Sequence, residues 1–274
     1  VFAVGTSSGE DVDGGGVSLD AGATSGLGEG ATGGLVDIVG GTGGDVDGGS
    51  ISMSGGNSNS RTGGTVRLLS GASAAARSGD VAVSSASAIA ATSGSVAVTS
   101  GATSGASGHI QIQTGTAAND VGDMVICVGA SAGATGGNVS VNAGATYAVS
   151  TAGGDVKMAS GRSTAGLGGK VDIRSGDSSF GTGGDVAFTS GKGRETSSGY
   201  VAVSTSDAGL SGDSGAVSMT TGASSAGASG KISMATGAAE TGTAGAIEVG
   251  VGTSDQAGGN VVVSSGDGHA ASSN

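Results

Sequence analysis

The sequence repeats one short unit along almost its entire length, and this constrains the fold more than any other feature. The unit reads Gly-x-φ-x-φ-x-x-Gly, where φ is a large apolar residue, and a segment of small residues follows it. From Val17 to Val261 the pattern advances 244 residues in sixteen steps, or about 15 residues per unit. One unit contributes only two substantial apolar side chains, so it cannot form a core alone and needs neighbouring units.

The two φ positions predict a strand with one buried face. They are two residues apart and mostly β-branched, which is typical of half-buried strands. The position between them accepts Arg67, Gln111 and Lys157, so that face is expected to be solvated. The first φ residues are Val17, Val36, Ile51, Val66, Val81, Val96, Ile110, Met124, Val139, Val156, Val171, Val186, Val201, Val217, Ile232, Ile247 and Val261.

Glycine marks both ends of each expected strand. A Gly stands two residues before the first φ in all seventeen units, and a second Gly follows the strand in fifteen of them, with Ala86 and Ser206 as the exceptions. Such recurrence indicates corners at which the backbone either adopts a positive φ angle or passes too close to its neighbour for a Cβ atom.

A third position, two residues after the second Gly, is always small and uncharged. The alternation of this position with variable neighbours suggests a second, thinner side packed against the Val/Ile strand. Its hydroxyl-bearing members include Thr24, Ser58, Ser73, Thr103, Ser131, Ser163, Ser178, Ser224 and Ser254.

These features predict an all-β fold, a single-stranded parallel β-solenoid (β-helix) of about 17 coils with a 15-residue repeat. An alternative places two repeats in each coil. Residues 1–274 are expected to form one continuous domain. Both ends lack a recognisable polar cap, since residues 1–5 begin inside a strand and residues 270–274 stop just before the next. Uncapped strand edges recruit other chains, so we expect homo-oligomers by end-to-end stacking, or a piece of a longer array.

The charge and the apolar pattern exclude several classes of partner. The net charge is −12, and only ten Lys and Arg residues are scattered along the chain, which disfavours nucleic acid and anionic membrane surfaces. No apolar run is long enough to span a bilayer, so membrane insertion is not expected. A single cysteine, Cys127, excludes an internal disulfide framework.

Two acidic segments are the best metal candidates. Asp11 and Asp13, and likewise Asp45 and Asp47, alternate with Val before a pair of glycines, and such carboxylates can converge on a hard cation such as calcium. No other cofactor is predicted. Asn138 begins the one N-glycosylation acceptor pattern, Asn-Val-Ser.

The sequence contains no constellation typical of catalysis. The two histidines, His109 and His269, are 160 residues apart and have no Ser or Cys and Asp at a catalytic spacing. Cys127 is expected on the solvated side of its strand as a free thiol. The chain is therefore predicted not to be an enzyme.

The Ser-Gly-Ala-Ser/Thr and Gly-Gly-x-Val-x-Val texture of residues 99–115 and 127–144 resembles the Gly/Ser-rich β-solenoid repeat proteins of algal and protist cell surfaces. This resemblance implies a structural extracellular protein, such as a subunit of a head-to-tail filament, sheath or surface appendage, with possible glycan or surface contacts. One alternative is an ice-binding (antifreeze) solenoid, which would need a flat and regular face. A second is an adhesin stalk that holds another domain away from a surface.

Overall fold

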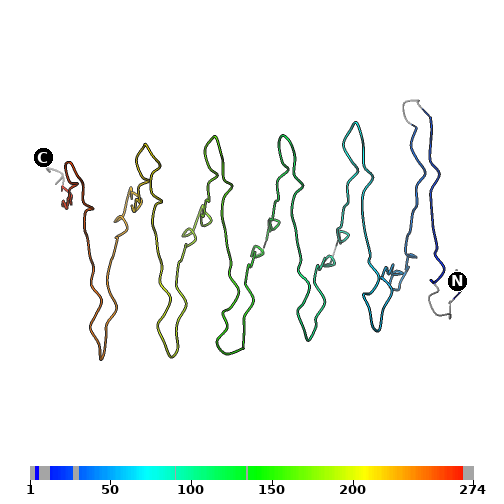
Figure 1. Ribbon diagram of the computed structural model, residues 1–274, viewed down its shortest axis with the longest axis horizontal. Helices are drawn as coiled ribbons and strands as arrows, with labels where there is room; N and C mark the ends of the chain where they lie inside the picture. Colours follow the sequence, from blue (N-terminus) through cyan, green and yellow to red (C-terminus); the bar gives the residue numbers. More distant parts are fainter. Residues whose placement is uncertain (1–3, 6–12, 27–30, 90, 134, 268–274) are drawn as a thin grey trace. The chain divides into compact units, whose positions relative to one another are not determined.

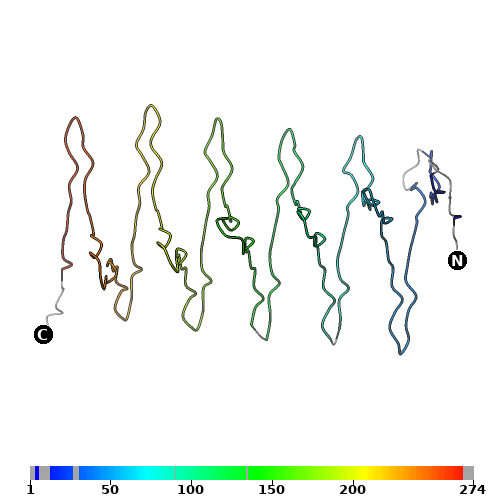
Figure 2. The ribbon, with the colours of Figure 1, turned by 60° about the horizontal axis from the view of Figure 1, so that its bottom comes forward.

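The computed structural model describes residues 4–5, 13–26, 31–89, 91–133 and 135–267. Contacts along the backbone divide the chain into two units, Val1–Val139 and Ser140–Asn274. Within each unit the described residues contain no helix and no strand. They consist of extended runs separated by bends and short loops (Figures 1 and 2).

The predicted β-solenoid, with either one or two repeats per coil, is therefore wrong. A solenoid needs ladders of backbone hydrogen bonds between successive units, and no described residue belongs to such a ladder. It also needs a continuous core, whereas no described side chain is buried. Two apolar side chains per unit bury too little surface to offset the entropy of ordering a glycine-rich chain. The sequence also predicted that residues 1–5 begin inside a strand and that residues 270–274 end just before one. These two segments lie largely outside the described residues.

The period-two alternation itself is visible locally in the extended runs. Side chains two residues apart on one face reach each other in several units, as expected for an extended backbone. These contacts join Ser18 to Asp20, Gln111 to Gln113, Ser140 to Asn142, Asp155 to Lys157, and Asp172 to both Lys170 and Arg174. The sequence pattern thus describes the conformation of each run, although the runs do not pair.

Most of the regular backbone bonding lies across the small-residue segments. The N–H of the Gly that begins one unit donates to the C=O of the second Gly of the preceding unit, which closes the segment into a loop. We call these segments Gly-closed loops. Their donor and acceptor pairs are Gly34–Gly22, Gly49–Gly41, Gly64–Gly56, Gly79–Gly71, Gly154–Gly144, Gly169–Gly161, Gly184–Gly176 and Gly199–Gly191, at 2.8–3.0 Å.

Close approach of the backbone explains why Gly begins these units. A Cβ atom added at Gly49 would lie 2.8 Å from the nitrogen of Gly41, and one at Gly64 would lie 2.8 Å from the nitrogen of Gly56. No atom lies within 4 Å of a Cβ placed on either acceptor, Gly41 or Gly56. Of the two explanations offered by the sequence, close approach is correct at Gly34, Gly49 and Gly64. At Gly79, Gly184 and Gly199 the nearest backbone atom lies 3.5–3.7 Å from an added Cβ, which is an ordinary contact. Among the described glycines, a positive φ angle occurs only at Gly212, which is not a corner position.

Heating the full-length protein tests the absence of a core. Because no described side chain is buried, we expect no cooperative endotherm in differential scanning calorimetry and no helix or sheet bands in far-ultraviolet circular dichroism. A sharp transition with an enthalpy near the globular average of about 0.7 kcal/mol per residue would contradict this structure.

Replacement of the donor glycine tests the Gly-closed loop. Gly64→Ala places a methyl group against the backbone of Gly56 and is expected to break the bond, whereas Gly56→Ala places its methyl group in open space. One such hydrogen bond contributes about 1 kcal/mol, so exchange of the residue-64 amide should become on the order of five-fold faster in the first variant only. The exchange rate of the residue-64 amide is measured by nuclear magnetic resonance. Equal rates in the two variants would show that the hydrogen bond to Gly56 does not require glycine at position 64.

Candidate interaction surface

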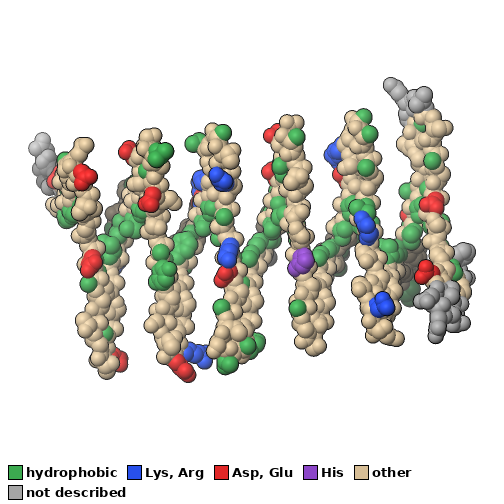
Figure 3. All heavy atoms as spheres, viewed as in Figure 1, with side chains coloured by type: hydrophobic (Ala, Val, Ile, Leu, Met, Phe, Trp, Pro, Cys, Tyr) green, Lys and Arg blue, Asp and Glu red, His purple; other side chains and the backbone are tan. Residues whose placement is uncertain are grey.

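The apolar pairs of the repeat form a series of exposed side chains along the chain (Figure 3). The first φ residues are 43% to 65% exposed and the second 52% to 92%. The described residues also enclose no pocket. Exposed apolar side chains that recur in one pattern are typical of a surface that contacts another molecule.

Large apolar residues at the Gly-rich loops add to this surface and were not singled out by the sequence pattern. Leu167 and Phe180 lie in Gly-closed loops and are 97% and 105% exposed. Val46 and Tyr147 also lie in Gly-closed loops. Ile89 and Leu210 lie in the equivalent segments of two further units. Their signal in the sequence is a single large apolar residue that interrupts a run of small ones.

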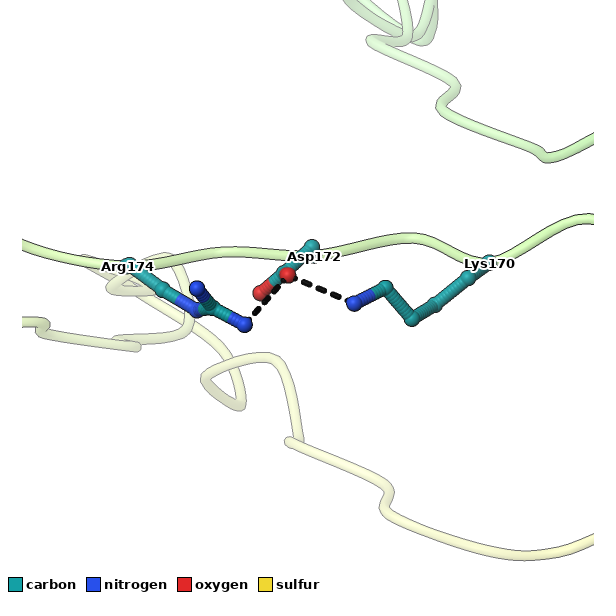
Figure 4. A network of polar contacts seen from close by, with 3 residues as sticks. All are labelled: Lys170, Asp172 and Arg174. Atoms are coloured by element: carbon teal, nitrogen blue, oxygen red, sulfur yellow. Dashed lines mark hydrogen bonds and ion pairs between the residues drawn. The ribbon is translucent and has the colours of Figure 1, made fainter.

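Charged side chains flank the apolar pairs in the run 170–174. The carboxylate of Asp172 lies 2.7 Å from Lys170 Nζ and 2.7 Å from the guanidinium of Arg174 (Figure 4). All three side chains occupy alternate positions of one extended run, so they share a face. In the preceding unit Lys157 Nζ lies 3.0 Å from Asp155. The cations are at least 73% exposed, so these pairs orient charge and contribute little stability.

Ser and Thr hydroxyl groups accept hydrogen bonds from backbone N–H groups within the loops. Ser163 Oγ accepts a hydrogen bond from the N–H of Gly166 at 2.8 Å, and Thr24 Oγ1 accepts one from the N–H of Gly26 at 3.2 Å. Such Ser and Thr turns are local substitutes for a backbone hydrogen bond. The same arrangement occurs at Ser58, Ser73, Thr103, Thr146, Ser178, Ser224 and Ser254.

These caps explain Ser and Thr at the position that is always small and uncharged, which holds Gly or Ala in the other seven units. The sequence suggested that it forms a thin side packed against the Val/Ile strand, and this interpretation is wrong for the described residues because none of them is buried. A short hydroxyl side chain suits the position because it reaches an N–H two or three residues ahead. Where the residue is Ser or Thr, the position therefore acts as a local turn cap.

The metal candidates are only partly covered by the structure. Asp11 lies outside the described residues, and Asp13 is exposed. Asp45 and Asp47 are exposed in the Gly-closed loop between Gly41 and Gly49. In the described part of the chain, no group of three or more His, Cys, Asp or Glu side chains is placed to hold an ion, whereas calcium takes six to eight oxygen ligands. Calcium at Asp13, Asp45 and Asp47 stays a prediction.

The other residues noted in the sequence do not gather into one site. Asn138 is exposed just before the apolar pair of its unit, and glycosylation there stays a prediction. Cys127 is an exposed free thiol, and His109 is exposed. His269 lies outside the described residues.

Searches against protein-family models, curated proteins and solved structures found no match for this chain. Within the described ranges, no helix is both long and apolar enough to cross a membrane. The arguments about function therefore rest on the exposed apolar pairs, the loops and the charges.

Removal of one cap tests how the loops are ordered. Ser163→Ala leaves the Gly166 N–H without its acceptor, so exchange of that amide should become on the order of five-fold faster, as for the loss of one hydrogen bond. Ser163→Thr should retain the slow exchange, since a Thr hydroxyl has this role in the loop of Thr24. Thr164→Ala is the matched control. A Gly166 amide that is unchanged in Ser163→Ala would show that the cap does not order the loop.

Proposed function

We propose that this chain is a structural protein, or a segment of one, whose repeated units associate with further copies of the same chain. The observation that carries this proposal is the exposure of the apolar pair in every one of the seventeen units. A side chain that recurs in an apolar pattern yet stays exposed gains free energy when another molecule covers it. Because all units present the same pattern, association with copies would use the whole length of the chain.

The repetition of similar units supports the role of a structural protein. A repetitive chain with seventeen similar contact points can bind through many weak contacts at once, which raises the overall strength of association. The described residues contain no pocket and no group of three or more His, Cys, Asp or Glu side chains that could hold a metal, so nothing in them favours an enzyme over a structural protein.

A position outside the cell or at its surface is part of this proposal. It is supported by the compositional resemblance to Gly/Ser-rich surface proteins and by the exposed acceptor residue Asn138. An adhesin stalk would use the chain in a related way, as a spacer. Ice binding depended on a flat solenoid face, and no observation in the described residues favours it.

Electron microscopy and sedimentation of the protein as isolated test the structural role. We expect assemblies that grow with protein concentration at neutral pH, because more copies cover more of the exposed apolar pairs. Addition of a calcium chelator should leave the assemblies unchanged if the contacts are apolar. Their loss on chelation would instead assign the assembly to metal sites such as Asp45 and Asp47. Monomers at every concentration would overturn the proposed self-association.

A further inference from the structure

Asp47 differs from most aspartates of the chain in the residue that follows it. Of the seventeen Asp residues, eight precede Val or Ile and only three precede Gly. The three are Asp13, Asp47 and Asp267. A β-branched side chain crowds the backbone N–H beside it, whereas Gly leaves this nitrogen open. Among the Gly-closed loops that the structure describes, only the loop between Gly41 and Gly49 contains an Asp–Gly pair, Asp47–Gly48.

Neither reactive group of this pair is held by another bond. The N–H of Gly49 donates to the C=O of Gly41 at 2.8 Å, but the N–H of Gly48 donates to no described residue. The carboxylate of Asp47 takes part in none of the hydrogen bonds and ion pairs that join described carboxylates to other side chains. The carboxyl carbon of Asp47 and the nitrogen of Gly48 are therefore free to react with each other.

We propose that Asp47 converts spontaneously to isoaspartate. The nitrogen of Gly48 attacks Cγ of the protonated side chain, and the new N–Cγ bond closes a five-membered succinimide ring. The carboxyl hydroxyl and the amide hydrogen leave together as one molecule of water. Hydrolysis then adds one water molecule and opens the ring. If the N–Cγ bond breaks, aspartate returns, and if the bond from nitrogen to the main-chain carbonyl carbon breaks, isoaspartate forms. The mass of the chain is unchanged, and no oxidant or reductant is needed.

The product alters the main chain at a crowded place in the loop. A Cβ atom added at Gly43 would collide with the carbonyl oxygens of both Val46 and Asp47, so these oxygens lie close to the Cα atom of Gly43. In isoaspartate the main chain passes through Cβ and Cγ of residue 47 and is one carbon atom longer. The former carbonyl oxygen of Asp47 then belongs to a free, negatively charged carboxylate.

We expect this change to open the loop. The N–H of Gly49 must meet the C=O of Gly41, and an extra main-chain atom two residues earlier shifts the donor relative to its acceptor. The loop Gly41–Gly49 therefore has two covalent forms, closed with aspartate and open with isoaspartate, and their ratio depends on the age of the chain. The reaction takes place within one chain and does not depend on the proposed self-association.

Peptide mapping of the full-length protein tests the modification. The protein is kept at neutral pH, and samples taken over time are fragmented by electron transfer, which distinguishes the two main-chain connections at each Asp. Isoaspartate at residue 47 should increase with time. Asp45 lies in the same loop but precedes Val46, so it should remain unchanged. No isoaspartate at residue 47, or equal conversion at Asp45 and Asp47, would overturn the proposal.

Two variants separate the reacting groups from the rest of the loop. Asp47→Glu retains the charge but would need a less favourable six-membered ring, so conversion should be lost. Gly48→Ala places a methyl group beside the attacking nitrogen and should slow conversion. Its Cβ atom would lie 3.5 Å from the C=O oxygen of Gly41, an ordinary contact, so the loop should stay closed. Conversion in Gly48→Ala at the wild-type rate would contradict the role of Gly48.

Hydrogen exchange of the Gly49 amide tests whether the loop opens. In a partly converted sample, nuclear magnetic resonance should show two Gly49 amide signals, one for each form of residue 47. The signal of the isoaspartate form should exchange on the order of five-fold faster, as for the loss of one hydrogen bond. The amide of Gly169 is the control, because it donates to Gly161 in a loop without Asp or Asn and should keep one rate. Equal rates for the two Gly49 signals would overturn the opening of the loop and leave the modification in place.

Discussion

The hydrogen bond between paired glycines is the interaction on which the rest of the structure depends. It joins the N–H of Gly49 to the C=O of Gly41, for example, and turns a run of small residues into a closed loop. The bond forms because the donor, Gly49, carries no Cβ atom, which would lie 2.8 Å from the nitrogen of Gly41. Since no described side chain is buried, these bonds and the hydroxyl caps inside the loops supply most of the order that the described residues have.

The loops also determine what the chain presents to other molecules. They separate the extended runs, so the apolar pairs recur at regular places and remain uncovered. They also hold charged residues such as Arg162 and Asp45, and large apolar residues such as Phe180, at exposed positions. A chain built in this way gains most from contacts that repeat along its length. For this reason the proposed function is assembly and not chemistry at a single site.

The sequence alone predicted the local structure well and the long-range structure poorly. The alternation of Val171 and Ile173 with Lys170, Asp172 and Arg174 predicted a run with two different faces, and the ion pairs of Asp172 lie on one of them. The exposed apolar residues at the loops, such as Leu167 and Phe180, carried a weaker signal, because one large residue among small ones has no period. The prediction of a solenoid failed because it required pairing between runs, which periodicity within each run cannot establish.

What the sequence determined by itself is the unit: its length, its two faces, its glycine corners and the charge carried by each stretch. These depend on residue size, backbone sterics and spacing, which act over a few residues. Only the tertiary structure decided that eight of the corners close by a Gly–Gly hydrogen bond, that Ser and Thr at the small position cap a turn, and that the apolar pairs stay exposed. Those features depend on whether separate units bury each other, and two apolar side chains per unit are too few to enforce this within the described residues.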